Sequence, residues 1–380
     1  MVYKDYRGIK LSALGFGAMR LPVIGGDDSR IDEEETFKMV DKAMTAGINY
    51  YDTAWGYHDG YSEIVMGKAL AKYERDKFYI ATKFPGYDLS NMGKVKEIFE
   101  KQLEKTGMEY FDFYLFHNVC EMNIEQYLDP KFGIYDYLME QKKNGRIKHL
   151  GFSCHGEYKT MKRFLDAYGK DMEFCQIQLN YLDWEFQDAK AKVDLLNEWN
   201  IPIWVMEPLR GGRLAKLDEQ SEKELKALRQ EEAIPAWAFR FLQSVKGVTM
   251  VLSGMSNMEQ LEANLKTYAE DKPLNDREMS ALMAIADRMQ AKKSIPCTAC
   301  HYCVSHCPMG LDIPYIISLY NEHLLTAQAG GMAFIAPMAL MAMPDDKKPS
   351  ACLHCHSCEH VCPQTIKISD MMADFVNKIG

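Results

Sequence analysis

The sequence predicts an α/β chain: a (β/α)8 TIM barrel followed by a smaller C-terminal domain that is helical and rich in cysteine. Three observations support this prediction. Short apolar runs alternate eight times with amphipathic segments between Leu11 and about Ala269, which favours a parallel sheet covered by helices. Helical periodicity stops near residues 291–296, and eight of the 11 cysteines follow. We therefore expect the barrel in residues 1–290 and the second domain in residues 291–380, and 380 residues leave room for both.

The predicted strands are short runs rich in β-branched, aromatic and aliphatic residues. They are residues 14–18, 48–53, 78–83, 111–117, 150–153, 174–179, 203–206 and 249–253. The segments between them repeat apolar residues at helical spacing. They predict helices at residues 33–46, 62–73, 94–106, 134–143, 158–168, 189–199, 219–230 and 258–268, with two more at 236–243 and 276–290.

The composition is that of an ordinary globular protein, with 47% hydrophobic and 26% charged residues. A formal net charge of −9 argues against a nucleic-acid partner, because phosphate binding needs a basic face. The sequence has no basic start with an apolar run that would resemble a signal peptide. Its most apolar segment, residues 332–343, is interrupted by Pro337 and is too short to span a bilayer. We expect no membrane span and a cytoplasmic location.

The eight C-terminal cysteines form two matching runs, each with the spacing Cys-x-x-Cys-x-x-Cys-x-x-x-Cys-Pro. In bacterial ferredoxins this spacing holds a pair of [4Fe–4S] clusters, and the fourth cysteine of each run ligates the other cluster. Two residues between ligands let the chain curl around a cluster face, and the proline ends any helix after the fourth ligand. One cluster is then assigned to Cys297, Cys300, Cys303 and Cys362. The other is assigned to Cys352, Cys355, Cys358 and Cys307.

Zinc sites and disulfides are the alternatives for these cysteines. Zinc knuckles usually present four ligands as two separated pairs, and disulfide frameworks belong to small secreted chains. Several histidines lie among the cysteines, and we expect them at the surface or beside cluster sulfurs. The long segment between Cys307 and Cys352 contains a predicted helix at residues 313–327, so the module resembles the α-helical ferredoxins that relay electrons within larger oxidoreductases. We expect the other three cysteines, Cys120, Cys154 and Cys175, to be packing residues.

Four polar residues lie at or just beyond the C-terminal ends of successive predicted strands, where TIM barrels carry their active sites. Asp52 and Tyr57 follow the second strand, Lys83 ends the third, and His117 ends the fourth. A carbonyl that accepts hydride also needs a proton, and tyrosine, with an ordinary pKa of about 10, is a poor acid unless its phenolate is stabilised. Lys83 can supply the stabilising charge, and Asp52 can keep it protonated and oriented. His117 can donate a hydrogen bond to the carbonyl oxygen.

The run Asp52-Thr53-Ala54-x-x-Tyr57, the strand-terminal lysine and the strand-terminal histidine resemble the catalytic tetrad of the aldo-keto reductase family, in order and in strand number. The resemblance covers about residues 5 to 270 and implies reduction of aldehydes and ketones with NAD(P)H. It also implies cofactor contacts, at positions that match the family less fully. These are Gly17, Met19, Ser153, Gln176, Met206, Leu209, Gln260 and Asn264.

Some departures from the family pattern affect the expected cofactor. Cys154 stands where relatives have an asparagine after Ser153, and Met206 stands where many place a stacking aromatic residue. Gly254 and Gln260 occupy positions where NADP-specific relatives often carry a lysine and an arginine for the 2′-phosphate. The resemblance therefore leaves NAD, NADP and even a flavin such as FMN open.

The two predicted centres handle electrons differently, because a hydride carries two electrons and each cluster passes one. Our leading hypothesis is an aldo-keto-reductase-like enzyme that acts on a small carbonyl or alcohol, with Tyr57 as general acid and two clusters as an electron relay. One alternative is a flavin- or ferredoxin-linked electron-transfer enzyme on the same barrel, with a ferredoxin-type donor or acceptor as partner. The other is a non-enzymatic redox-sensing binding module. Four aromatic residues in predicted loops are expected either to line a substrate pocket or to pack. They are Trp55, Tyr181, Trp184 and Phe186.

Overall fold

The computed structural model describes residues 1–379 apart from 292–294, 296, 298–301, 328–332 and 363. The chain forms two compact units. The first, which we call the barrel unit, comprises Met1–Pro208 and Arg229–Met279. The second, the helical unit, comprises Leu209–Leu228 and Ser280–Gly380. The expected boundary between residues 290 and 291 stays a prediction.

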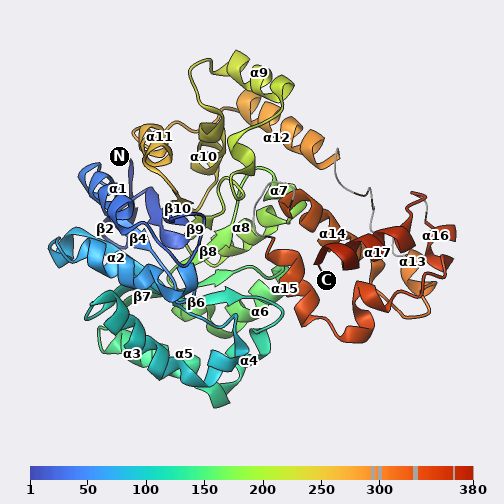
Figure 1. The fold of residues 1–380 in the computed structure, drawn as a ribbon, viewed down its shortest axis with the longest axis horizontal. Coiled ribbons are helices and arrows are strands. Elements are labelled where there is room, and N and C mark those ends of the chain that lie inside the picture. Colours follow the sequence, from blue (N-terminus) through green and yellow to red (C-terminus); the bar gives the residue numbers. More distant parts are fainter. Residues whose placement is uncertain (292–294, 296, 298–301, 328–332, 363, 380) are drawn as a thin grey trace. The chain divides into compact units, whose positions relative to one another are not determined.

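Eight parallel strands close into a barrel in the order β10-β3-β4-β5-β6-β7-β8-β9 (Figure 1). Their bounds are β3 Leu14–Gly17, β4 Tyr50–Asp52, β5 Tyr79–Phe84, β6 Phe111–Val119, β7 Ile147–Cys154, β8 Cys175–Gln178, β9 Ile203–Met206 and β10 Val248–Gly254. The predicted TIM barrel is therefore confirmed, and each strand begins and ends close to its predicted position. In β6 all nine residues are buried, as expected of a parallel strand that is covered on both faces.

An N-terminal β-hairpin, which was not predicted, covers the N-terminal end of the barrel strands. Its strands β1 (Tyr3–Tyr6) and β2 (Ile9–Ser12) pair in antiparallel fashion, and Gly8 takes a left-handed conformation (φ 86°) in the turn. The Tyr6 ring meets the Trp204 ring edge-on at 5.0 Å between centroids, and its hydroxyl donates to the Glu173 carbonyl oxygen just before β8. The C-terminal end of the strands is therefore the end available for chemistry.

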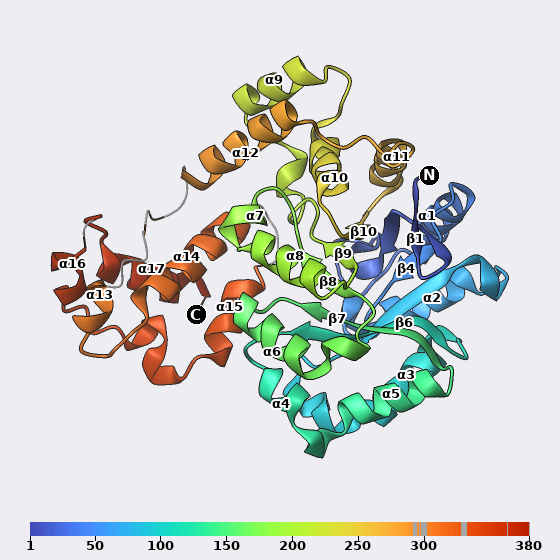
Figure 2. The ribbon, with the colours of Figure 1, turned by 180° about the vertical axis from the view of Figure 1, so that it is seen from behind.

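All ten helices predicted in the first 291 residues are present, and those of the barrel unit surround the strands (Figures 1 and 2). They are α1 Glu33–Thr45, α2 Ser62–Leu70, α3 Val95–Thr106, α5 Ile134–Lys143, α6 Tyr158–Tyr168, α8 Ala189–Glu198, α9 Glu219–Leu228, α10 Ile234–Ser244, α11 Met258–Thr267 and α12 Asp276–Ala291. Two short helices, α4 (Ile124–Leu128) and α7 (Asp183–Phe186), were not predicted. Helix α1 begins after Asp32, whose carboxylate accepts from the Glu35 amide at 3.0 Å, a standard N-cap.

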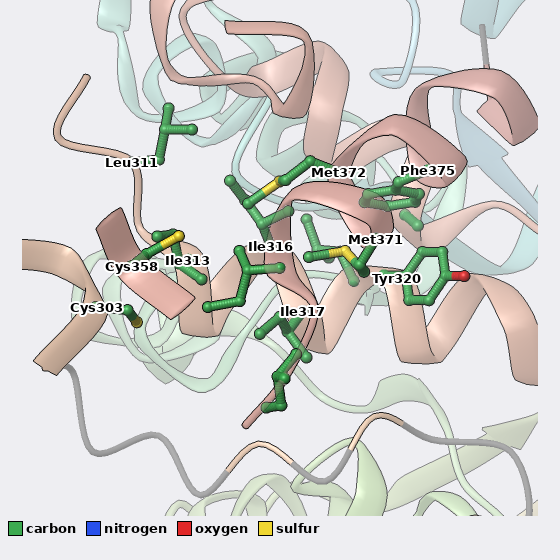
Figure 3. Packing of buried hydrophobic residues seen from close by; sticks show 14 of the residues in the cluster. Cys303, Leu311, Ile313, Ile316, Ile317, Tyr320, Cys358, Met371, Met372 and Phe375 are labelled. Atoms are coloured by element: carbon green, nitrogen blue, oxygen red, sulfur yellow. The ribbon is translucent and has the colours of Figure 1, made fainter. Parts of the chain in front are cut away.

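Besides α9 and most of α12, the helical unit contains five described helices, which carry a core of their own. They are α13 Tyr302–Ser305, α14 Ile313–Ala327, α15 Ile335–Ala342, α16 Ser357–His360 and α17 Ile368–Ile379. Figure 3 shows the buried cluster, with Tyr320 and Phe375 at one end and Cys303 and Cys358 at the other. The predicted helix at residues 313–327 matches α14. The cysteines thus lie at the edge of a packed hydrophobic core.

The apolar segment at residues 332–343 forms helix α15 over most of its length. Ala336 and Ala339 are buried, whereas Met341 is 69% exposed. In the described part of the chain, no helix combines the length and apolar character needed to cross a membrane.

Candidate functional site

The four predicted catalytic residues lie at the C-terminal end of the barrel strands. Asp52 is the last residue of β4, Lys83 lies one residue before the end of β5, and His117 lies near the end of β6. Tyr57 begins the 3-10 turn Tyr57–Gly60 that follows β4. Because parallel strands of a barrel all end at the same rim, residues from three strands meet at one place.

The Lys83 ammonium holds this group together. It is fully buried and donates to Asp52 Oδ1 at 2.5 Å. It also donates to the Thr53 carbonyl oxygen at 2.8 Å and reaches the Tyr57 hydroxyl at 3.4 Å. A buried cation is tolerated only when its donors are satisfied and its charge is balanced. Lys83 meets both conditions while it contacts the predicted proton donor.

The charges around Tyr57 determine its protonation. Burial raises the pKa of the Tyr57 phenol above its ordinary value, and the Lys83 ammonium opposes that rise. Lys83 therefore acts in the predicted direction, although burial outweighs it and Tyr57 is protonated at neutral pH. Burial by itself lowers the pKa of Lys83, but Asp52 and Tyr57 outweigh burial and raise it, so the cation persists. The arrangement is suited to a neutral phenol beside a fixed positive charge.

His117 lies next to the phenol as a neutral imidazole. Its ring centroid is 6.2 Å from that of Tyr57, with the two ring planes at 79°. Burial, then the Lys83 charge and His155, hold the pKa of His117 well below its ordinary value. Its Nδ1 has no hydrogen-bond partner among the described residues. A neutral imidazole can donate one hydrogen bond, and the site is therefore chemically able to polarise a carbonyl oxygen near Tyr57.

A second layer of buried polar groups, missed in the sequence, supports Lys83. Gln102 on α3 donates from Nε2 to the Lys83 carbonyl oxygen at 3.0 Å and to Glu63 Oε1 at 2.7 Å. Glu63 is fully buried and also accepts from Thr82 at 2.6 Å and from the Lys105 ammonium at 2.6 Å. The available signal was Gln102 itself, a polar residue among the apolar positions of an amphipathic helix.

Seven of the eight predicted cofactor residues belong to the barrel unit, and Leu209 is the first residue of the helical unit. Ser153 and Gln176 are buried on β7 and β8, and Met206 ends β9. The Ser153 hydroxyl accepts from the Asn118 amide at 2.7 Å. The others are Gly17 at the end of β3, Met19 in the turn after it, Leu209 after β9, and Gln260 and Asn264 on α11. The strands that carry these residues, β3, β7, β8 and β9, are different from β4, β5 and β6, which carry the tetrad.

One buried atom tests whether these residues suit a nicotinamide. Gln176 Oε1 is buried and has no hydrogen-bond partner among the described residues, while its Nε2 contacts Met206 Sδ at 3.7 Å. A buried amide oxygen left unsatisfied costs free energy, and a carboxamide N–H group is a suitable donor for it. The residues present therefore fit the carboxamide end of a nicotinamide.

Three of the aromatic residues that were expected either to line a pocket or to pack make contacts with other residues of the barrel unit. Tyr181 is buried, and its ring lies 6.4 Å from that of Phe241 on α10. Trp184, on the unpredicted helix α7, meets Phe241 edge-on at 5.5 Å. Trp55 lies in the loop before Tyr57, under the Lys105 ammonium at 4.6 Å. Tyr181 and Trp184 thus pack against α10, and Trp55 lies beside the tetrad.

In the helical unit, four cysteines line one cavity. They are Cys307, Cys352, Cys355 and Cys358. These residues are the set assigned to one cluster from the sequence, including the fourth cysteine of the first run. Leu311, Ile313 and Met372 add an apolar lining. The donor set of the cavity therefore fits a group that is held by four thiolates.

The residues around this cavity have an unusual backbone conformation and a raised thiol pKa. His354 (φ 51°) and His356 (φ 58°) both take left-handed conformations, which are uncommon outside glycine. Burial raises the pKa of the Cys358 thiol to about 11, and the nearby Cys352 and Cys307 add to the rise. Within the described ranges, no three His, Cys, Asp or Glu side chains are grouped so as to hold a single metal ion. The cysteines surround a cavity instead of meeting at a point.

The other assigned cluster set is only partly described. Cys303 is buried in the core of the helical unit, and Cys297 and Cys362 pack against that core. Cys300 lies outside the described residues. Cys120 and Cys154, expected to be packing residues, are buried in the barrel unit, and burial raises their thiol pKa values to about 11 and about 12. They are therefore poor nucleophiles.

Two models of known protein families match two separate regions of the chain. A family model described as the aldo/keto reductase family matches residues 13–287. A second model, described as a 4Fe-4S dicluster domain, matches residues 296–366.

Individual relatives match the first region. The chain is 29% identical over 217 residues to probable aldo-keto reductase 1 of Glycine max, an alignment that covers 54% of this chain and 58% of that protein. It is 23% identical over 328 residues to the NADH-specific methylglyoxal reductase of Escherichia coli (strain K12), covering 74% and 97%. The holo form of an aldo-keto reductase from Bacillus halodurans superposes with a TM-score of 0.61 at 24% identity, covering 75% and 96%.

Proposed function

Since the chain belongs to the aldo/keto reductase family and carries a C-terminal 4Fe-4S dicluster domain, we propose that it reduces a small carbonyl compound with a nicotinamide cofactor, or oxidises the matching alcohol. In this proposal Tyr57 is the general acid, and the two clusters relay electrons. The observation that carries the proposal is the buried Lys83 ammonium, which touches both the Asp52 carboxylate and the Tyr57 hydroxyl.

Each residue of the tetrad has a defined task. In reduction, the proton moves from the Tyr57 hydroxyl to the substrate oxygen, and in oxidation it returns. Lys83 stabilises the phenolate that remains, and Asp52 keeps the ammonium in place. The neutral His117 donates a hydrogen bond to the same oxygen and orients the substrate.

A bound nicotinamide supplies the hydride. We propose that Ser153 and Gln176 hold its carboxamide, and that Gly17, Met19 and Met206 lie beside its ring. Leu209, Gln260 and Asn264 are proposed for the rest of the nucleotide. Gly254 and Gln260 bring no cation for a 2′-phosphate, which favours NADH over NADPH, and the Escherichia coli relative is NADH-specific by name.

The cysteines hold the second centre, whose clusters transfer one electron at a time. Cys307, Cys352, Cys355 and Cys358 are proposed as one ligand set, and the cavity that they line supports this set. Cys297, Cys300, Cys303 and Cys362 are proposed as the other. Thiolate ligands suit a reducing compartment, so we propose a cytoplasmic protein with a ferredoxin-type electron donor or acceptor.

The test uses the anaerobically purified protein with both clusters. We expect it to oxidise NADH or NADPH in the presence of small aldehydes and ketones, and Tyr57→Phe to lower kcat by about 10²–10⁴-fold. Tyr79→Phe is the matched control, because Tyr79 lies at the opposite, N-terminal end of β5. Undiminished turnover by Tyr57→Phe would disprove the role of the tetrad, and release of FMN on extraction would show that the barrel uses a different cofactor.

A further inference from the structure

We infer that His58 is a positioning residue that holds Tyr57 beside Lys83 by fastening the turn after β4 to the loop after β3. This inference rests on the proposed function. His58 follows Tyr57 directly, is 2% exposed, and takes a left-handed conformation with φ 52° and ψ 51°. His58 belongs neither to the tetrad nor to the proposed cofactor contacts, so neither role explains why its imidazole is buried.

The backbone after Tyr57 is held in an unfavourable form. His58, Asp59 (φ 52°) and Gly60 (φ 89°) are left-handed in succession. Glycine adopts this conformation freely, but histidine and aspartate do so at a cost. A strained turn persists only where the surrounding structure fixes it. We therefore consider which contacts of the His58 side chain hold this turn in place.

The His58 ring makes two hydrogen bonds, one from each nitrogen. Nε2 accepts from the Leu21 amide at 3.0 Å. Because Nε2 accepts, the proton of the neutral ring is on Nδ1, which donates to the Asp28 carbonyl oxygen at 2.9 Å. The Asp28 carboxylate lies 3.1 Å from the same nitrogen. Both partners belong to the loop between β3 and α1.

The β3–α1 loop contains Met19, which is proposed to lie beside the nicotinamide. Ser62 makes a second connection between the segment after β4 and the β3–α1 loop. The Ser62 hydroxyl donates to the Ala18 carbonyl oxygen at 2.9 Å and pairs with the Thr53 hydroxyl at 2.9 Å. His58 and Ser62 thus attach the segment that follows Tyr57 to the β3–α1 loop at two points. A shift of this segment would change the 3.4 Å approach of Tyr57 to Lys83.

Three substitutions at His58 separate the effect of its backbone conformation from the effect of its side-chain hydrogen bonds. His58→Gly removes the strain and both bonds, His58→Gln keeps an acceptor near the position of Nε2, and His58→Asn tolerates the left-handed conformation but is too short to reach Leu21. Asn200→Gly is the control, because Asn200 is an exposed left-handed residue (φ 54°) before β9.

The first measurement is amide hydrogen exchange, which needs no substrate. In His58→Gly and His58→Asn we expect the Leu21 amide to exchange at least about tenfold faster than in the wild type, and in His58→Gln we expect most of its protection to return. Unchanged protection of Leu21 in His58→Gly would overturn the inference.

The second measurement is steady-state kinetics. We expect His58→Gly to lower kcat about tenfold, with little change in the carbonyl KM or in the melting temperature, and Asn200→Gly to leave kcat unchanged. A lower melting temperature with an unchanged kcat would show a purely structural role and would also overturn the inference. If the wild type itself reduces no carbonyl, the proposed function fails, and Leu21 exchange alone then decides whether His58 holds the turn.

Discussion

The barrel unit and the helical unit hold their polar centres in different ways. The tetrad is assembled by the protein itself: Lys83 is fully buried, balanced by Asp52, and supported from behind by Gln102. The cysteines of the helical unit line a cavity, in a loop where two histidines are left-handed. The first centre is therefore complete before any ligand binds, whereas the second has its ligands arranged around a space.

This difference can be measured because the two units have separate signals. All five tryptophans of the chain lie in the barrel unit, at positions 55, 184, 199, 204 and 237. Tryptophan fluorescence therefore reports the unfolding of the barrel unit. The absorption and electron paramagnetic resonance of bound clusters report the helical unit.

The largest effect is expected when the buried cation is removed. Lys83→Met leaves the Asp52 carboxylate buried without its partner, and breaking such a pair typically costs about 3–5 kcal/mol. We expect the free energy of unfolding to fall by about that amount and kcat to fall about 10²–10⁴-fold. Denaturant titration followed by tryptophan fluorescence measures the first, and carbonyl turnover the second.

A matched control for this change is Lys142→Met. Lys142 pairs with Glu173 near the opposite end of the barrel and is a quarter exposed. Its loss is expected to cost less than about 1 kcal/mol, with no effect on kcat. If Lys83→Met and Lys142→Met lowered the free energy of unfolding and kcat equally, the buried Lys83–Asp52 pair would be no more important than a partly exposed ion pair.

The tetrad and the cysteine runs could be predicted because each has a local signature. Asp52, Lys83 and His117 each lie at the end of an apolar run, and barrel geometry brings such ends together without further information. The crossing of Cys307 into the second run's set follows from ligand spacing. In both cases the sequence pattern is enough to predict which residues lie near one another.

The remaining features depend on contacts between distant segments. Gln102 reaches Glu63 and the Lys83 carbonyl from helix α3, and His58 receives its hydrogen bond from Leu21, 37 residues earlier. The Asp59-Gly60 pair after His58 indicates a turn, but nothing in the sequence identifies Leu21 and Asp28 as the partners of the His58 ring. The N-terminal hairpin had a local signal in its Arg7-Gly8 turn, but its position depends on the contact of Tyr6 with Trp204.

The second prediction removes one cluster ligand. Cys358→Ala should lower the iron and sulfide content to about half, because one cluster loses a ligand while the other set stays intact. NAD(P)H-dependent carbonyl turnover should stay within about twofold, since the tetrad is complete in the barrel unit. Cys120→Ala, which changes a buried cysteine of the barrel unit, is the control and should keep both clusters. Loss of turnover in Cys358→Ala would show that the two centres are coupled.

The third prediction concerns acid. Burial lowers the pKa of His155 to about 4 and also lowers that of His117. Between pH 6.5 and 4, the unfolded chain therefore binds protons at these histidines that the folded chain does not, and folding becomes less favourable as pH falls. For His155 the loss is at most about 3 kcal/mol. The urea midpoint, followed by tryptophan fluorescence, should fall between pH 7 and pH 5.

The difference between variants isolates the histidines from other titrating groups. His155→Gln should lose less stability than the wild type over this pH interval, and His306→Gln, an exposed histidine of the helical unit, should behave as the wild type. If the urea midpoints of both variants fall with pH as much as that of the wild type, groups other than His155 cause the loss of stability in acid.

The smallest effect concerns the choice of nucleotide. Gln260 is exposed in the first turn of α11, where its Oε1 accepts from the Ser256 amide at 2.8 Å. Gln260→Arg adds a guanidinium that can bind a 2′-phosphate, so we expect the affinity for NADPH relative to NADH to rise about tenfold. Gln260→Met removes the same loop hydrogen bond without adding charge and should leave the ratio unchanged. Dissociation constants from nucleotide fluorescence give the ratio directly. A ratio that does not move in Gln260→Arg would place the adenosine end of the nucleotide away from α11, and it would separate that contact from the nicotinamide site at Gln176.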